Sequence, residues 1–472
     1  MSAGAELRPR PALPALAGAL EARAGFVRAL EEAQPGELVV VDLAAPLAPV
    51  HALLAAPGRA LAWQPPDGEG VALAGLGAAA RIIAHGVRRM DEVRERAGAL
   101  WARVRVAGAP GAPPPRLIGG FAFALGASGD LWRDFPPAAF TLPRWRYARD
   151  GARAWLSFAA EGSELGRPEA RAAAVDELDG VLSRLLRGRA PLPDLDDGGP
   201  AAPRDEADGG YQARVEAIRA EIASGRCEKV VAARALTLAL PGPAPVAVVL
   251  ERLTTCAPSC TRYAFREGGS AFIGATPERL LAVSGREVRG EALAGTARAG
   301  AAAALLESQK DLGEHAPVVR AIVAALDWRC EALEVPARPL ARQLGGIVHL
   351  ATPVRGRLRA PAHLLELAAA LHPTPAVGGA PAEPALRWIA AHEPAPRGWY
   401  AGPVGWFDAA GDGELMVALR SAVLAGGGRR ATLFAGAGIV ADSDPAAEWA
   451  ETELKLASLR AALLDAAAGQ AA

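Results

Sequence analysis

The sequence predicts an α+β protein in which antiparallel strands and helices are segregated along the chain. Short apolar runs bounded by Gly and Pro indicate strands in both halves. Other stretches have apolar residues at helical spacing. The chain has 472 residues, of which 51% are hydrophobic, so it is long enough for two to three domains or one large one, with an ample core.

The first part of the chain mixes both element types. Strand-like runs occupy residues 37–44, 116–125 and 152–160, and helical patterns cover 91–104 and 168–186. The beginning of the sequence is interrupted by prolines and has no compact apolar segment, so we expect no signal peptide.

A boundary is predicted at residues 188–210, which are rich in Pro, Gly and Asp and contain almost no large apolar side chain. Such a composition is typical of a solvated linker or long loop. It separates an N-terminal α+β region, residues 1–187, from a second α+β domain, residues 211–467. No internal repeat is apparent.

The second region begins with a helix, because apolar residues recur at helical spacing from Tyr211 to Ile222 and Gly225 supplies a stop. We expect one long helix over residues 301–335 and a last helix starting near Asp444, an N-cap residue followed by Pro. The remaining expected elements are strands at 229–240, 271–283 (broken at Gly274 and Pro277), 402–409, 413–424 and 429–440, and a helix at 363–372.

Composition excludes several classes of function. The net charge of -1 gives no support to binding of nucleic acid or of an anionic membrane surface. No apolar run reaches the ~18 residues of a transmembrane helix. The four cysteines are irregularly spaced, and Cys256 and Cys260 have no second pair to complete a zinc site. We therefore expect reduced thiols and a cytoplasmic protein.

Lysine is nearly absent. The chain has three lysines, Lys229, Lys310 and Lys455, against forty-eight arginines. Arg stays protonated, whereas a buried Lys can act as a base and its compact ammonium fits where a planar guanidinium does not. These three positions therefore indicate that the second region carries the chemistry.

Carboxylates accompany two of the lysines. Glu448, Glu451 and Lys455 share one face of the last helix, while Glu453 points elsewhere. Asp311 and Glu314 are a second pair at i, i+3, beside Lys310. Two helices that each offer two carboxylates could hold Mg²⁺, which takes one or two carboxylates plus water. A solvated acidic patch is the alternative for each pair alone.

Three further features are candidates for a site. Glu278 follows Pro277 at the end of an apolar strand, where a raised pKa and a general-acid role are possible, although a surface Glu is the commoner case. Arg420 lies in an apolar strand and needs a carboxylate from the protein or from a ligand. The segment AGAGIV (435–440) is either a tight turn or a close approach of backbone N–H groups to an anion. His349 and His372 are interpreted as structural histidines.

Taken in order, these segments resemble the chorismate-utilising enzymes. The motifs are KVVAAR, FIGATPERL, EALAGTA, KDLGEH, HLATPVRG, HPTPAVGG, WYAGPVGW, LFAGAGIV and DPAAEWAETELK, across residues 211–465. The group comprises isochorismate synthase, salicylate synthase, anthranilate synthase large chain and aminodeoxychorismate synthase. The resemblance implies antiparallel sheets packed with flanking helices. In the N-terminal region, IGGFAF followed by DLWRDFPPAAFTLPRW looks like the menaquinone-type isochorismate synthases.

Individual residues indicate the member of the group. Lys229 opens KVV, where amine-adding members carry Gln, so the resemblance implies water as the nucleophile. Ala294 stands where aminodeoxychorismate synthases carry Lys. HLATP and HPTPA look most like isochorismate synthases. We therefore expect an isochorismate synthase for menaquinone or siderophore biosynthesis, without an obligate glutaminase partner. Salicylate synthase is the first alternative, followed by a component of anthranilate or aminodeoxychorismate synthase and by a non-catalytic homologue.

The resemblance also implies roles for residues. Lys229 would deprotonate water attacking C2 of chorismate, and Glu278 would protonate the departing C4 hydroxyl. Glu314 and Glu451 would hold Mg²⁺, with Asp311 and Glu448 acting through water. The remaining substrate-binding residues would be Gly295, Thr296, His349, Thr352, Ala376, Tyr400, Arg420, Gly436, Gly438 and Lys455.

Overall fold

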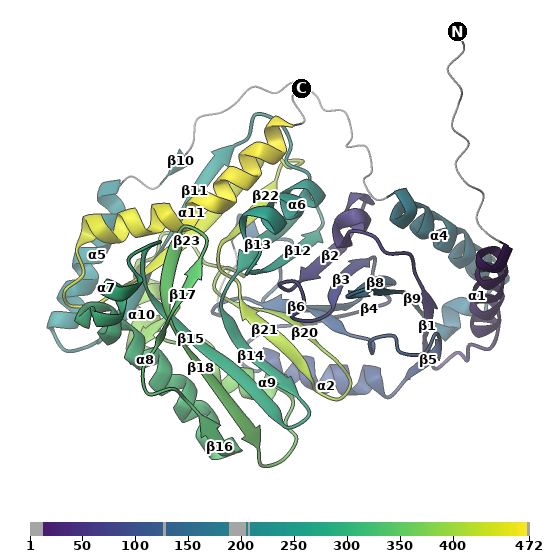
Figure 1. Cartoon of the computed structure of the whole chain (residues 1–472), viewed down its shortest axis with the longest axis horizontal. Coiled ribbons are helices and arrows are strands. Elements are labelled where there is room, and N and C mark those ends of the chain that lie inside the picture. Colours follow the sequence, from purple (N-terminus) through teal and green to yellow (C-terminus); the bar gives the residue numbers. More distant parts are fainter. Residues whose placement is uncertain (1–12, 126–128, 188–203, 206–207, 470–472) are drawn as a thin grey trace, which may run out of the picture.

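The computed structural model describes residues 13–125, 129–187, 204–205 and 208–469. Two large, mainly antiparallel sheets dominate this part of the chain, with helices around them (Figure 1). The α+β class and the antiparallel sheets with flanking helices predicted from the sequence are confirmed. None of the helices in the described ranges is long and apolar enough to cross a membrane.

The larger sheet has thirteen strands among the described residues, and every pairing in it is antiparallel except β1 with β5. Its order is β10 (Arg204–Asp205), β11 (Lys229–Ala239), β23 (Arg430–Ile439), β22 (Ser421–Ala425), β13 (Ser270–Thr276), β12 (Thr261–Glu267), β2 (Ala60–Gln64), β3 (Ala72–Leu76), β8 (Trp145–Asp150), β9 (Arg153–Glu161), β1 (Leu38–Ala44) and β5 (Val104–Gly108), with β19 (Gly379–Ala380) beside β11.

The smaller sheet has ten strands within the same described ranges. Its order is β16 (Cys330–Glu334), β18 (Ile347–Leu358), β15 (Glu287–Arg298), β14 (Arg279–Ser284), β21 (Gly413–Val417), β20 (Pro403–Phe407), β6 (Leu117–Phe121), β7 (Ala138–Leu142) and β4 (Ala80–Ala84), with β17 (Leu340–Leu344) beside β18.

Helices cover the outer faces of these sheets and their edges (Figure 1). The α-helices are α1 (Leu13–Glu31), α2 (Arg89–Trp101), α3 (Gly162–Leu165), α4 (Pro168–Arg187), α5 (Asp208–Ala223), α6 (Val246–Cys256), α7 (Ala302–Glu307), α8 (Gln309–Leu326), α9 (Leu364–Leu371), α10 (Ala382–His392) and α11 (Pro445–Ala468), and the 3₁₀ turns are η1 (Val50–Ala55), η2 (Asp130–Trp132) and η3 (Asp327–Arg329).

Strands from both sides of the predicted boundary combine in each sheet. In the larger sheet β2 pairs with β12, placing Ala62 opposite Ala264, and in the smaller sheet β6 pairs with β20. An apolar core that includes Trp132, Phe272 and Trp399 joins the two sheets. Most of residues 188–210 lies outside the described residues, so the predicted linker remains a prediction.

The prediction of one long helix over residues 301–335 is wrong. The chain forms α7, α8, η3 and β16 there instead. Ser308 separates the two helices, because its hydroxyl accepts the backbone N–H of Asp311 and caps the start of α8. At the other end Cys330 opens a strand that pairs with β18, a tertiary interaction that overrides helix propensity.

Two local expectations about strands also need correction. The run 271–283 does not break at Gly274, which lies inside β13 and pairs with Tyr263 and Ser421. Glycine is required there because a Cβ would collide with the Tyr263 hydroxyl. Arg420 does not lie within a strand but between β21 and β22, where its φ of 49° breaks the run. The N-cap expected at Asp444 is confirmed.

Candidate active site

A small cavity lies where both sheets and α8 and α11 meet. Its volume is about 70 Å³. Of the residues singled out from the sequence, those that line it are Glu278, Gly295, Thr296, Glu314, His349, Ala376, Tyr400, Arg420, Gly436, Gly438 and Lys455. Residues from nine separate stretches of the chain therefore converge on one pocket, which we call the central pocket.

Glu278 is a buried acid in this pocket. It follows Pro277 between β13 and β14, and the residue is 4% exposed. Burial raises the pKa of its carboxyl to about 8, the charge of Glu291 adds to this effect, and Lys229 and Lys455 oppose it. The carboxyl is therefore protonated at neutral pH, as the apolar strand before it suggested.

Lys229, the first residue of β11, lies directly behind the lining residues. Its Nζ is 3.1 Å from Glu314 Oε1 and donates to the backbone oxygen of Glu314 at 3.3 Å. Both side chains pass over Gly438, where a Cβ would collide with the Glu314 carboxylate and with Lys229 Cε. Gly436 and Gly438 lie inside β23, so the glycines of AGAGIV do not form a tight turn.

The other two lysines are also paired with glutamates. Lys310 Nζ donates to Glu448 Oε1 at 2.7 Å, and this contact joins α8 to α11. Lys455 Nζ lies 2.6 Å from Glu451 Oε1 and donates to the Gly436 carbonyl at 2.9 Å. All three lysines of the chain thus form ion pairs with carboxylates that sequence analysis assigned to a metal ion.

The described residues contain no group of three or more His, Cys, Asp or Glu side chains arranged to hold a metal ion. Mg²⁺ usually takes only one or two protein carboxylates and completes its shell with water and ligand oxygens. Burial alone would lower the pKa of Lys310, but Glu448, Glu314 and Glu451 together raise it. All three carboxylates therefore act on the same ammonium group. Hard oxygen donors on two facing helices fit Mg²⁺ in chemistry.

Asp311 has a local role in the structure. It lies in the first turn of α8, where its carboxylate accepts the hydroxyl of Ser308. It also packs against Gly295, whose φ of 76° requires glycine. Asp311, Glu448 and Glu451 are not lining residues of the central pocket.

His349 holds Arg420 in place. His349 Nε2 is 3.1 Å from Arg420 Nη2, while Nδ1 is 3.1 Å from both the Gly295 carbonyl and Thr296 Oγ1. Burial lowers the pKa of His349 well below its usual value, so the ring is neutral, donates from Nδ1 and accepts the guanidinium at Nε2. Among the described residues, no carboxylate forms an ion pair with Arg420. Its charge is available to a ligand in the pocket.

Some of the other predicted residues line the central pocket, and others lie behind the residues that line it. Tyr400 lines the pocket and stacks on Phe434 with ring centroids 5.1 Å apart. Thr352 does not line it; its hydroxyl lies 2.8 Å from His315 Nε2 in the buried layer behind. His372 is structural, as expected, because its Nε2 is 3.0 Å from the carbonyl oxygen of Phe123.

Sequence analysis missed Arg397, which also lines the pocket. It is 6% exposed, donates to the Val377 and Val231 carbonyls at 2.6 and 2.9 Å, and pairs with Glu393 at 2.5 Å. These bonds tie the segment after Ala376 to β11. The signal was present as a Glu and an Arg four residues apart, just before WYAGPVGW.

Comparison with known proteins defines the class. A family model described as chorismate binding enzyme matches residues 28–464, and the chain belongs to this family.

Comparison with individual proteins gives more specific similarities than the family model does. The chain is 38% identical over 461 residues to the salicylate biosynthesis isochorismate synthase of Pseudomonas aeruginosa, covering 93% of this chain and 94% of the relative. It is 34% identical over 366 residues to isochorismate synthase MenF of Bacillus subtilis, covering 74% of each. The solved menaquinone-specific isochorismate synthase MenF of Escherichia coli superposes with a TM-score of 0.76 at 28% identity, covering 95% of this chain and 100% of the other.

Proposed function

We propose that this protein is an isochorismate synthase, which moves the hydroxyl function of chorismate from C4 to C2. The names of the relatives support this activity, and the match to one of them extends over nearly the whole chain. The observation that carries the proposal is the central pocket itself. It combines a protonated carboxyl, Glu278, with Arg420, a cation that no carboxylate of the described residues neutralises.

The two ends of the reaction need a base and an acid. We assign the base to Lys229, which in its neutral form takes a proton from the water whose oxygen bonds to C2. As that bond forms, both ring double bonds shift and the C4–O bond breaks, and Glu278 supplies the proton that leaves with the C4 hydroxyl as water. The pKa of about 8 for Glu278 supports this role, since the proton is held at neutral pH and still transferable.

The substrate carries two carboxylates, and the pocket offers a partner for each. We assign the enolpyruvyl carboxylate to Arg420, oriented by His349, and to the backbone near Gly436 and Gly438. The ring carboxylate would be neutralised by Lys455. The described pocket is smaller than the ~300–1,000 Å³ of most ligand sites, so we expect its lining side chains to move apart when substrate enters.

Magnesium is part of the proposal. Glu314 and Glu451 would hold the ion, with Asp311 and Glu448 acting through water. When bound, it would neutralise the ring carboxylate as a Lewis acid. Lys229 and Lys455 pair with Glu314 and Glu451, so the ion would share these two carboxylates with the lysines.

The experiment is incubation of the purified protein with chorismate and Mg²⁺, with products separated and identified by mass. We expect isochorismate in reversible balance with chorismate, because both sides have similar bonding. Loss of pyruvate would aromatise the ring and drive the reaction to completion. A lactate dehydrogenase-coupled assay follows pyruvate in parallel. Stoichiometric pyruvate would overturn the proposal in favour of salicylate synthase.

We assign the product first to menaquinone biosynthesis, since the N-terminal motifs resemble that subgroup and a solved relative is menaquinone-specific. Supply of isochorismate to a salicylate or siderophore pathway is the alternative, which the name of the Pseudomonas aeruginosa relative supports. The quinone content of a strain lacking the gene distinguishes the two.

A further inference from the structure

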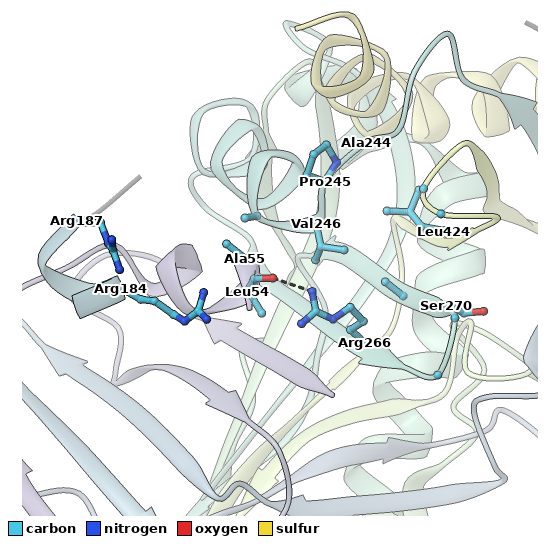
Figure 2. Close-up of a pocket in the computed structure, with 16 residues that line it drawn as sticks. Leu54, Ala55, Arg184, Arg187, Ala244, Pro245, Val246, Arg266, Ser270 and Leu424 are labelled. Atoms are coloured by element: carbon cyan, nitrogen blue, oxygen red, sulfur yellow. Dashed lines mark hydrogen bonds between the residues drawn. The ribbon is translucent and has the colours of Figure 1, made fainter. Parts of the chain in front are cut away.

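A second, larger cavity lies at the opposite end of β13 and β22 from the central pocket. Its volume is about 610 Å³. We call it the arginine cavity, and its principal lining residues are Leu54, Arg184, Arg187, Val246, Arg266 and Leu424. Figure 2 shows Arg184 extending from α4 toward Leu54, with Val246 and Leu424 on the other side.

Positive charge is concentrated on one wall of this cavity. Arg184 and Arg187 lie three residues apart in the last turn of α4, and neither forms an ion pair with a carboxylate of the described residues. The guanidinium of Arg266 donates to the backbone oxygens of Leu54, Ala56 and Gly58, which hold η1 and its following turn in place. No Asp or Glu is among the described lining residues, so this charge is not balanced locally.

The other walls are apolar. Leu54, Val246 and Leu424 face the cavity together with several alanines, and two glycine turns complete it. A volume of about 610 Å³ lies within the ~300–1,000 Å³ range of small-molecule sites. Apolar walls favour a ligand with an apolar body, and two arginines at one side favour a carboxylate at one end. The ligand class that fits is a small cyclic carboxylate.

The two cavities are connected by a pair of adjacent strands. At the arginine cavity Ala271 of β13 is opposite Leu424 of β22. Along β13 the chain reaches Glu278 two residues after the strand ends, and β22 begins directly after Arg420. A shift of β13 against β22 would therefore move the proposed general acid relative to the carboxylate-binding arginine.

We propose that the arginine cavity binds a small cyclic carboxylate and that its occupancy changes turnover at the central pocket. Binding in this cavity is independent of the proposed function, because it is measured without chorismate. The probes are benzoate, which has a ring and a carboxylate, benzamide, which lacks the charge, and inorganic phosphate, which lacks the ring.

Calorimetric titration of the whole protein tests the binding. We expect benzoate to bind at least about tenfold more tightly than benzamide or phosphate, since each lacks one of the two features. The double variant Arg184→Gln/Arg187→Gln should weaken benzoate binding by about tenfold or more. Arg153→Gln, an exposed arginine outside the cavity, is the matched control and should change nothing.

A third variant adds a bulky side chain at the lining of the cavity and keeps its arginines. A Cβ at Gly269 would have no atom within 4 Å, and its φ lies outside the left-handed region, so Gly269→Leu is tolerated by the backbone. It should abolish benzoate binding while turnover without benzoate stays unchanged. No benzoate binding at millimolar concentration, or equal binding by the double variant, overturns the site. Phosphate binding as tight as benzoate overturns the ligand class.

Turnover of chorismate tests the connection. Saturating benzoate should change kcat or KM in the wild type and in Arg153→Gln but not in Gly269→Leu. Inhibition that is competitive with chorismate and persists in Gly269→Leu would place benzoate in the central pocket and overturn the proposal. Benzoate binding that leaves both kinetic constants unchanged would overturn the coupling.

Discussion

The central pocket and the arginine cavity carry positive charge in different ways. In and behind the central pocket, Lys229 and Lys455 each form an ion pair with a glutamate. In the arginine cavity, Arg184 and Arg187 have no carboxylate partner among the described residues. The chain has three lysines against forty-eight arginines, and the third lysine, Lys310, also pairs with a glutamate, Glu448.

The difference follows from the chemistry of the two cations. A guanidinium is a permanent charge, suited to holding an anion, whereas an ammonium is compact and can give up its proton. The central pocket needs a group that changes its protonation state, and the arginine cavity does not. The predictions below test this contrast, beginning with the change of largest expected effect.

Lys229→Arg should lower kcat by about 10³-fold, because the charge remains but the capacity to accept a proton is lost. Turnover of chorismate measures the loss, and circular dichroism with thermal unfolding checks that the variant folds. The reciprocal change Arg184→Lys should leave turnover unaffected. Near wild-type turnover of a folded Lys229→Arg protein would show that the site needs only a positive charge at position 229 and not a group that accepts a proton.

Glu278→Gln should lower kcat by about 10²–10³-fold, since an amide cannot supply the proton. The pH dependence gives a second test. A carboxyl whose pKa is raised to about 8 keeps its proton below that pH and loses it above. Wild-type kcat should therefore fall as pH rises through about 8, and the residual activity of Glu278→Gln should lack this descending limb. A wild-type profile that stays flat to pH 9 contradicts the assignment.

Glu314→Gln and Glu451→Gln should each raise the Mg²⁺ concentration needed for half-maximal activity by about tenfold or more. Metal titration of turnover and calorimetry with Mg²⁺ alone measure this. Glu453→Gln is the control on the same helix. Its side chain pairs with Arg234 and Arg460, so thermal stability should fall without a change in the Mg²⁺ requirement. Equal sensitivity of Glu453 and Glu451 to substitution would contradict the metal assignment.

Local patterns predicted the features that depend on neighbouring residues. The cap at Asp444 was readable because an N-cap and a following Pro act within one turn. The i, i+3, i+7 spacing placed Glu448, Glu451 and Lys455 on one face of α11, and Glu453 does point elsewhere.

Features that depend on distant contacts were not readable. The break at Ser308 was hidden by the Ala-rich stretch before it, and strand β16 forms only because β18 is available to pair with it. The pairing of β2 with β12 across the predicted boundary is equally invisible in sequence. In the site, the Lys310–Glu448 contact joins residues 138 positions apart, so helical spacing could not show that Lys310 pairs with Glu448.

Thr352→Val should have the smallest effect, a change of only a few fold in KM for chorismate with kcat nearly constant. Thr352 was expected to bind substrate, yet its hydroxyl is bonded to His315 behind the pocket. Losing that bond leaves a buried imidazole nitrogen unpaired, which should mainly lower stability. His349→Ala is the matched comparison, because it releases Arg420 inside the pocket and should raise KM by about tenfold or more. Thermal unfolding and steady-state kinetics of both variants separate the two roles. If Thr352→Val raised KM as much as His349→Ala does, Thr352 would contribute to substrate binding. The distinction between residues that line the central pocket and residues that support them from behind would then be wrong at this position.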